Sequence, residues 1–168
     1  MTILFLILAS IVYAWVSLAP WVPTSNKDLN RLHKIAKLKK GETFLEMGCG
    51  NGRVCTYIAR KNPSAKVIGI ELALPFYLFT KIRVMIFGPK NLKIIFGNAL
   101  KYDISNIDVI YVFGLMETVN KEIKKKIEKE LPKNSRFISY IFTIKEWSGQ
   151  KETHKETDKT SGIHVYMK

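Results

Sequence analysis

Cysteine and histidine are scarce in this chain of 168 residues. Its two cysteines, Cys49 and Cys55, lie close together in the sequence, and its three histidines are scattered, so neither type has the spacing of a zinc site. No disulfide is expected, and the thiols should be reduced, as in the cytosol. The chain also lacks a Gly-x-x-x-x-Gly-Lys-Ser/Thr element, which argues against nucleotide hydrolysis. The expected chemistry therefore depends on neither a metal ion nor a P-loop.

Acidic residues are also few, because 14 aspartates and glutamates stand against 27 lysines and arginines, a net charge of +13. Charge of either sign is missing from residues 1–26, whereas residues 27–40 hold six cations and one acid. Residues 2–19 form an almost unbroken apolar run of about the minimum length that spans a bilayer. This pattern indicates contact with a membrane, although the positive charge alone would also suit RNA.

The apolar leader has three interpretations: a membrane anchor, a cleaved signal peptide and a buried N-terminal helix. No lysine or arginine precedes it and Pro20 directly follows the small-residue site, which disfavours a signal peptide. We expect one transmembrane helix over residues 1–20, with Trp15 and Trp21 at the interfaces. The cations that follow place the rest of the chain on the cytoplasmic side of the cell membrane. Residues 21–42 are then a linker and a helix, and residues 43–168 form the main domain.

Three glycines at alternate positions mark residues 44–53, Phe-Leu-Glu-Met-Gly-Cys-Gly-Asn-Gly-Arg. The apolar run predicts a strand with Glu46 at its carboxyl end, and Gly48, Gly50 and Gly52 supply the backbone freedom of a loop that approaches a nucleoside. A dinucleotide fingerprint would need a small residue where Arg53 stands. The spacing Glu-x-Gly-x-Gly-x-Gly resembles the first motif of the class I S-adenosylmethionine (SAM)-dependent methyltransferases. This resemblance implies SAM as the cofactor.

A second acid lies at the interval that a nucleoside site requires. Residues 53–60 predict a helix and residues 66–70 a short strand that ends at Glu71, 19 residues after Gly52. An acid about 20 residues after such a loop accepts hydrogen bonds from ribose hydroxyls. Taken alone, Glu71 could equally be a solvated acid at a strand end. Together with the glycine loop in a βαβ unit, it indicates a ribose ligand.

The third predicted strand, residues 92–96, is followed by Gly97, Asn98 and Ala99. The resemblance implies that a residue here contacts adenine, commonly as an aspartate, and the amide of Asn98 offers both an acceptor and donors. Asn98 is alternatively a turn former, and Asp103 is a nearby candidate with a weaker position. The candidate cofactor-binding residues are Glu46, Gly48, Cys49, Gly50, Gly52, Glu71, Leu72, Asn98 and Ala99.

The fourth predicted strand, residues 108–113, should end beneath the transferable methyl group, because ligands bind at the carboxyl ends of strands in open α/β sheets. Methyltransferases that act on amino groups of nucleobases or glutamine carry Asn/Asp-Pro-Pro-Tyr here, and this chain has Phe-Gly-Leu-Met-Glu. Glu117 is the candidate catalytic residue, since a carboxylate there would orient a lysine amine and help to desolvate it. Alternatively, Glu117 only opens the helix predicted over residues 117–130, where the helix dipole favours an acid.

The remaining pattern completes a Rossmann-like α/β fold. Residues 28–38 predict a helix that Ser25 or Asn26 caps, residues 135–144 a fifth strand and residues 163–167 a last one. Residues 145–161 must then supply a short strand and a turn. The resemblance implies a mostly parallel, twisted sheet with an antiparallel C-terminal hairpin, preceded by the transmembrane helix.

The order of features along nearly the whole chain makes the resemblance more specific. The chain has in order an apolar anchor, a Trp-Val-Pro-Thr linker, a short helix, the glycine motif and Ile-Glu-Leu, and it lacks a Pro-Pro-Tyr loop. This order is similar to that of the membrane-anchored protein-lysine methyltransferases. Their eukaryotic members modify the mitochondrial adenine nucleotide translocase and the ATP synthase c-subunit, and the resemblance is to a prokaryotic member. The resemblance implies methyl transfer from SAM to lysine side chains of a membrane-associated protein. An RNA or small-molecule methyltransferase and a non-catalytic SAM-binding membrane protein stay as alternatives, and steep salt dependence of activity would favour RNA.

Overall fold

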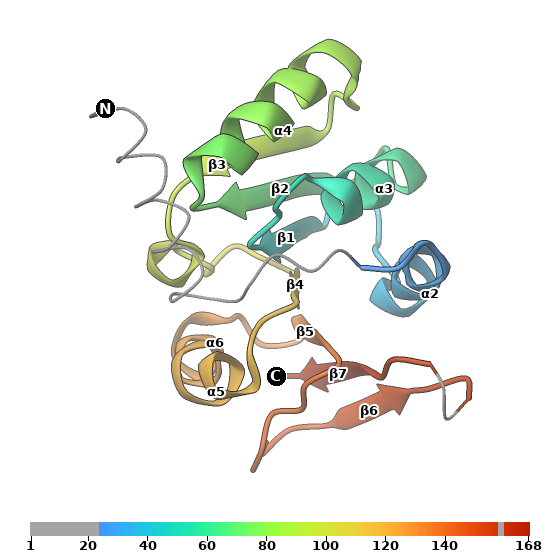
Figure 1. Cartoon of the computed structure of the whole chain (residues 1–168). Coiled ribbons are helices and arrows are strands. Elements are labelled where there is room, and N and C mark those ends of the chain that lie inside the picture. Colours follow the sequence, from blue (N-terminus) through green and yellow to red (C-terminus); the bar gives the residue numbers. More distant parts are fainter. Residues whose placement is uncertain (1–23, 158–159) are drawn as a thin grey trace.

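A seven-stranded sheet forms the centre of the structure, a computed structural model that describes residues 24–157 and 160–168 (Figure 1). The strand order is β3-β2-β1-β4-β5-β7-β6. Neighbours among β1 to β5 pair in parallel, and β7 pairs antiparallel with β5 and with β6. The strands are β1 (Thr43–Met47), β2 (Lys66–Glu71), β3 (Leu92–Phe96), β4 (Val109–Val112), β5 (Arg136–Tyr140), β6 (Lys151–His154) and β7 (Ile163–Met167). The predicted Rossmann-like sheet with an antiparallel C-terminal hairpin is confirmed.

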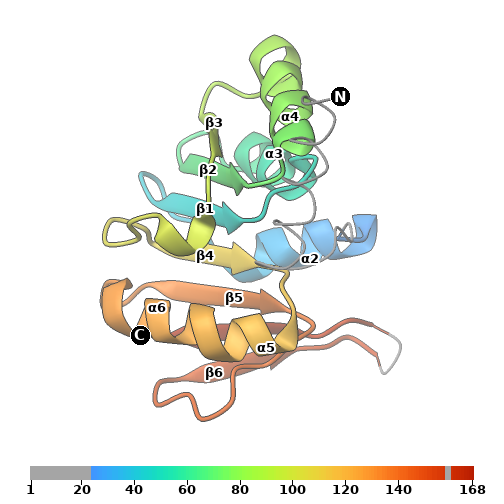
Figure 2. The ribbon, with the colours of Figure 1, turned by 60° about the vertical axis from the view of Figure 1, so that its left-hand side comes forward.

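Helices lie on both sides of the sheet (Figures 1 and 2). One side carries α2 (Asn26–Ala36), α3 (Arg53–Lys61) and α4 (Leu74–Phe87). The other side carries α5 (Met116–Thr118), the π-helical turn η2 (Val119–Ile123) and α6 (Lys124–Glu130), and the short 3-10 helix η1 (Ala99–Lys101) follows β3. Strand order reverses between β1 and β4, so the carboxyl ends of these two strands border the crevice where open α/β sheets bind ligands.

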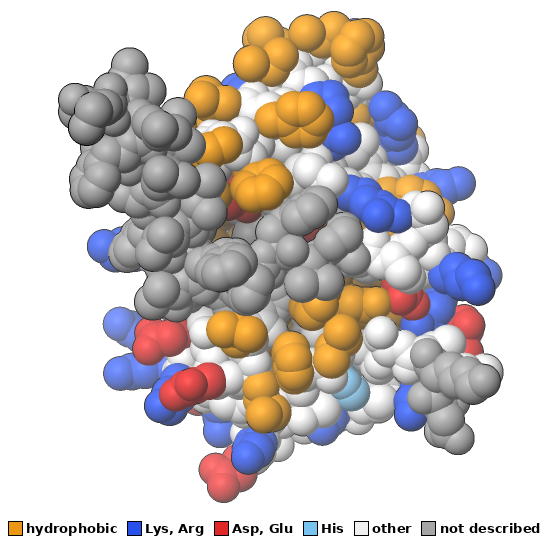
Figure 3. Space-filling model, viewed as in Figure 1, with side chains coloured by type: hydrophobic (Ala, Val, Ile, Leu, Met, Phe, Trp, Pro, Cys, Tyr) orange, Lys and Arg blue, Asp and Glu red, His pale blue; other side chains and the backbone are white. Residues whose placement is uncertain are grey.

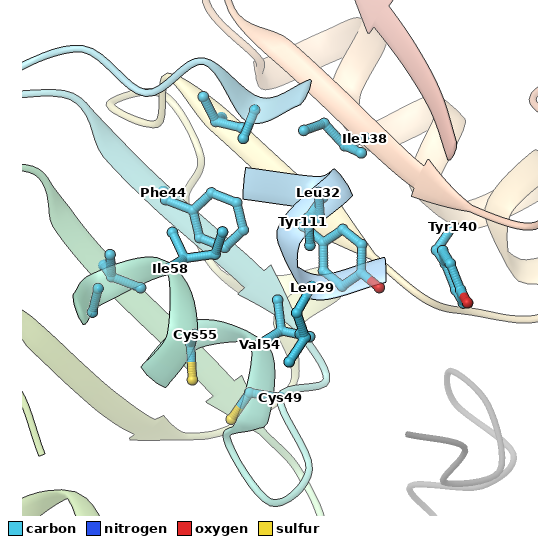
Figure 4. Close-up of a cluster of buried hydrophobic side chains, with 14 of the residues drawn as sticks. Leu29, Leu32, Phe44, Cys49, Val54, Cys55, Ile58, Tyr111, Ile138 and Tyr140 are labelled. Carbon is cyan, nitrogen blue, oxygen red and sulfur yellow. The ribbon is translucent and has the colours of Figure 1, made fainter. Parts of the chain in front are cut away.

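Two buried clusters hold these layers together because successive side chains of a strand point to opposite faces of the sheet. Phe44 of β1 packs with residues of α2 and α3, whereas its neighbour Leu45 packs with residues of η2 and α6. Figure 4 shows the first cluster, in which Leu29 and Leu32 of α2 approach Tyr111 of β4. Helix α2 is therefore part of the packed core.

Most predicted boundaries agree with the structure to within about two residues. The predicted strands at 92–96 and 163–167 are β3 and β7, and the Ser25 hydroxyl accepts a hydrogen bond from the Asp28 N–H at 3.2 Å to cap α2. The predicted fifth strand extends too far, because β5 ends at Tyr140 rather than at residue 144. Ile141 has a φ of 71°, and the Phe142 N–H donates to the carbonyl oxygen of Tyr140 at 3.0 Å. This tight turn takes the chain out of the sheet.

The predicted membrane anchor, residues 1–20, lies outside the described residues. Across residues 24–157 and 160–168, no helix is long and apolar enough to cross a membrane. The division of the chain at residues 20 and 42 stays a prediction.

Candidate cofactor and acceptor site

The glycine loop joins β1 to α3 at the carboxyl edge of the sheet. Gly48, Gly50 and Gly52 have φ angles of 74°, 51° and 69°, in the left-handed region that favours glycine. The N–H groups of Gly48 and Cys49 donate to the carbonyl oxygen of Ile70 at 3.0 and 2.9 Å, which holds the loop against the end of β2. The loop therefore has the conformation and the location that its glycine spacing predicts.

Glu71, the last residue of β2, joins the loop to the next strand. One carboxylate oxygen accepts from the N–H of Gly50 at 2.7 Å, and the other accepts from Leu72 and Ala73 at 3.0 and 2.7 Å. Burial raises the pKa of Glu71 above its ordinary value, although these three N–H groups act in the opposite direction. A carboxylate oxygen can accept more than one hydrogen bond, so Glu71 keeps acceptor capacity for a ribose diol.

Glu46 of β1 and Cys49 of the loop are both buried. A carboxylate oxygen of Glu46 accepts from the N–H of Cys55 at 2.8 Å, which ties β1 to the first turn of α3, and burial raises the pKa of Glu46 well above its ordinary value. A Cβ at Gly69 of β2 would lie 2.9 Å from the Cys49 sulfur, so this thiol needs a glycine beside it. These contacts stabilise the loop, and direct contact of Glu46 or Cys49 with the cofactor stays a prediction.

Asn98 follows β3 at the same edge of the sheet. Its side-chain oxygen accepts from the N–H of Leu100 at 2.9 Å and caps η1, which leaves its amide nitrogen as the donor for an adenine edge. Ala99 is buried, and Leu72 is partly buried directly after β2. Asp103 is a weaker candidate for the contact with adenine, because its exposed carboxylate accepts hydrogen bonds from the N–H and the hydroxyl of Ser105. The structure thus places all predicted cofactor residues at the carboxyl ends of β1, β2 and β3.

Two residues of α4 support the loop and escaped the sequence analysis, which assigned no element to residues 74–87. The buried Thr80 hydroxyl donates to the carbonyl oxygen of Gly50 at 2.8 Å, and Arg83 donates to that of Asn51 at 2.5 Å. A Cβ at Gly52 would lie 2.4 Å from the Thr80 methyl carbon. Thr80 and Arg83 are three residues apart and so share one side of a mostly apolar helix, which is the signal that could have identified them.

Glu117 lies in α5, just beyond the carboxyl end of β4. Its side chain is 75% exposed and its carboxylate pairs with the Lys121 ammonium group at 2.6 Å. The hydrogen bond from Lys121 lowers the pKa of Glu117 below its ordinary value. These contacts are those of a solvated acid at a helix start, and the catalytic role of Glu117 stays a prediction.

Apolar side chains surround the carboxyl ends of β4 and β5. Leu115, Met116 and Ile141 are 43%, 50% and 39% exposed, and the rings of Phe113 and Tyr140 meet edge to face with centroids 4.8 Å apart. We call these five residues the acceptor rim. A group of apolar side chains is visible in this region of Figure 3, below the centre of the view. The sequence analysis did not identify Tyr140 or Ile141 as site residues.

Helix α2 braces this rim from beneath. The carboxylate of Asp28 accepts from the hydroxyl groups of Ser25 and Tyr140, each at 2.6 Å, and pairs with Arg31. Burial works to raise the pKa of Asp28, but the hydrogen bonds from Ser25, Tyr140 and Arg31 outweigh it and lower that pKa. Helix α2 is thereby joined to the end of β5.

Residues 46–151 match the ANTKMT methyltransferase domain. The chain belongs to this methyltransferase family. A protein-lysine N-methyltransferase of Saccharolobus islandicus (strain REY15A) is 32% identical over 160 residues, which cover 92% of this chain and 95% of that relative. A human lysine N-methyltransferase of the ATP synthase c-subunit is 24% identical over 140 residues, 83% of this chain and 58% of the relative.

Solved methyltransferases share the fold. An RNA methyltransferase from Salinibacter ruber in complex with S-adenosyl-L-homocysteine superposes with a TM-score of 0.78 at 19% identity, over 87% of this chain and 93% of that one. An O-methyltransferase from Thermotoga maritima gives a TM-score of 0.67 at 15% identity, over 88% and 67% of the two chains. At these identities the likeness concerns the fold.

The site of this SAM-dependent methyltransferase fits its cofactor. Three loop glycines with positive φ allow close approach of the backbone, and Glu71 and Asn98 present an acceptor and a donor at adjacent strand ends. When bound, SAM supplies an electrophilic methyl group. The protein contributes the relative orientation of the cofactor and the acceptor. No group of three or more His, Cys, Asp or Glu side chains that could hold a metal ion occurs within the described part of the chain.

Proposed function

We propose that this enzyme transfers the methyl group of SAM to lysine side chains of proteins. The protein-lysine methyltransferase from Saccharolobus islandicus supports this acceptor, because its similarity extends over 92% of the chain and 95% of the relative. The human relative, which acts on the ATP synthase c-subunit by its name, supports the same class of acceptor.

The acceptor rim is the observation that carries the proposal. A lysine must lose its proton before its nitrogen can attack a methyl group, and apolar surroundings favour the neutral amine. The exposed side chains of Leu115, Met116 and Ile141 also offer packing for the four-carbon stem of lysine. A rim of this composition suits a long aliphatic amine better than a charged phosphate backbone.

A membrane-associated acceptor is the finer part of the proposal. The uncharged residues 1–20 would anchor the chain in the cell membrane as a single pass, and the six cations of residues 27–40 would keep the catalytic domain on the cytoplasmic side. An anchored enzyme meets lysines of neighbouring membrane proteins at a high effective concentration.

A labelling experiment tests the proposal. The purified full-length enzyme is incubated with tritiated SAM and with membrane proteins or total RNA from the source cell, and labelled proteins are mapped by mass spectrometry. The expected result is methyl-lysine in membrane proteins. Gly50→Arg serves as a control, since a large side chain at this loop position should abolish SAM binding and all labelling. Label in soluble proteins alone would contradict the membrane part of the proposal.

RNA is the second candidate acceptor, favoured by the net charge of +13. A tRNA (guanine-N(7)-)-methyltransferase of Streptococcus agalactiae is 29% identical over 127 residues, 73% of this chain and 56% of that relative. Incorporation of the methyl label into RNA, at a rate that falls steeply as salt is added, would support this candidate and contradict the lysine proposal.

A further inference from the structure

The outer side of α4 is an exposed apolar surface. Helix α4 packs on the core through Tyr77 and Val84 and on the glycine loop through Thr80, and these three residues lie on one side of it. Five large apolar side chains on the opposite side, and Phe87 at the C-terminal end of the helix, are each between 47% and 74% exposed. We call them the α4 surface: Leu78, Phe79, Ile82, Met85, Ile86 and Phe87. Apolar side chains gather over α4 at the top of Figure 3, where a helix of a soluble domain would ordinarily be polar.

Cations border the α4 surface and acids are missing from the chain around it. Between Glu71 and Asp103 the sequence has no acid and five cations, and three of these, Lys81, Arg83 and Lys90, lie in α4 or directly after it. The Lys81 ammonium group donates to a backbone carbonyl of β3 at 3.5 Å, and the Arg83 guanidinium lies 5.8 Å from the centre of the Phe79 ring. An apolar strip with cations along its border is complementary to lipid chains beneath anionic headgroups.

A bilayer fits this surface better than a protein partner does. Protein interfaces contain roughly one hydrogen bond per 100–200 Å², and the six apolar side chains of the α4 surface offer no side-chain donor or acceptor for one. Helix α4 has 14 residues and is about 21 Å long, so its outer side can lie along a membrane. We propose that the α4 surface lies in the interfacial layer of an anionic bilayer. This contact is separate from the apolar leader and goes beyond methyl transfer itself.

The proposed contact sets the orientation of the catalytic domain. Helix α4 lies at the end of the sheet that β3 closes, and it runs back along the strands that it connects (Figure 1). With α4 flat on the bilayer, the strands lie along the membrane plane. The carboxyl edge, with the glycine loop and the acceptor rim, then faces sideways rather than into the bilayer.

Fluorescence quenching at single sites tests the proposal. The full-length enzyme carrying Met85→Cys is labelled with bimane, and it is reconstituted into vesicles of phosphatidylcholine and anionic phosphatidylglycerol. Cys49 and Cys55 are 4% and 0% exposed, so the label should attach at residue 85 alone. Lys125→Cys, at an exposed position of α6 on the other side of the sheet, is the matched control. Brominated acyl chains quench from the lipid side and iodide quenches from water.

The expected result is loss of emission at residue 85 with brominated lipid but not with iodide, and the reverse at residue 125. Quenching of residue 85 by iodide would show that the surface lies in water and would overturn the proposal. Protection from both quenchers would show that protein covers the surface, either residues 1–23 or a second copy, and would also overturn it. Energy transfer between copies labelled with donor and acceptor would identify the second copy.

A charge on the α4 surface should reverse the result. Ile82→Glu in the labelled enzyme should weaken quenching by brominated lipid and restore quenching by iodide, because a carboxylate avoids the acyl layer. Ile82 is 52% exposed, so the variant should fold, and retained SAM binding verifies this. Equal lipid quenching in vesicles without phosphatidylglycerol would contradict the requirement for anionic lipid. Methyl transfer is measured separately, so failure of the lysine proposal would leave these outcomes unchanged.

Discussion

Replacing Thr80 by valine should loosen the glycine loop without creating a cavity. The hydroxyl of Thr80 is buried and donates to the carbonyl oxygen of Gly50 at 2.8 Å, while its methyl group packs on Gly52. Valine keeps that methyl group and leaves a buried carbonyl without its donor, which costs about 1–3 kcal/mol. For a chain of this size the Tm should fall by about 2–12 °C. If SAM binding to the variant must first restore the native loop conformation at a cost of about 1.4 kcal/mol, the Kd for SAM rises about tenfold.

Thermal unfolding followed by circular dichroism and titration calorimetry with SAM measure these effects. Thr80→Ser is the matched control, since it keeps the donor and removes the methyl group, so its affinity for SAM should stay near that of the wild type. If Thr80→Val binds SAM as tightly as the wild type and unfolds at the same temperature, the assigned role of this hydrogen bond is wrong.

Three further substitutions test the carboxylates. In the wild type, three backbone N–H groups donate to the carboxylate of Glu71, and Glu71→Gln would set an amide donor against some of them. Calorimetry should then show an affinity for SAM that is reduced about tenfold or more. Unchanged affinity would show that Glu71 is not part of the cofactor site. The pKa of Glu46 is raised in the folded protein, so the folded state binds this proton more tightly than the unfolded state does. The free energy of unfolding should therefore fall as the pH rises from the ordinary glutamate pKa to the pKa of Glu46 in the folded protein. Urea unfolding across this pH range should show a flatter dependence for Glu46→Gln, and equal slopes would contradict the burial argument. Glu117→Gln should preserve SAM affinity and slow methyl transfer about tenfold or more in a single-turnover assay, and full activity would show that Glu117 is not catalytic.

The cofactor half of the site could be predicted because its signals are local. Glycine is required where the backbone takes positive φ, and Gly48, Gly50 and Gly52 all do. The interval from Gly52 to Glu71 is set by the length of one helix and one strand, and Glu71 meets the loop at Gly50 as a βαβ unit requires. The strands themselves were predicted from apolar runs bounded by turn residues.

Helix α4 could not be assigned in the same way. Its apolar residues occur on all sides, so the sequence has no helical period that separates a core face from a solvent face. The length of β5 was overestimated for a related reason, since apolar residues continue past Tyr140 into a turn at Ile141.

The sequence by itself determined the glycine loop and the position of Glu71 at the end of β2, because each depends on residues close in the chain. Only the tertiary structure placed Thr80 under Gly50 and joined Asp28 to Tyr140, 112 residues away. It also decided that six large apolar side chains of α4 are exposed and that those around Tyr140 form the acceptor rim. These arrangements depend on how helices pack across the sheet, and that packing is a property of the whole set of core side chains rather than of any one segment.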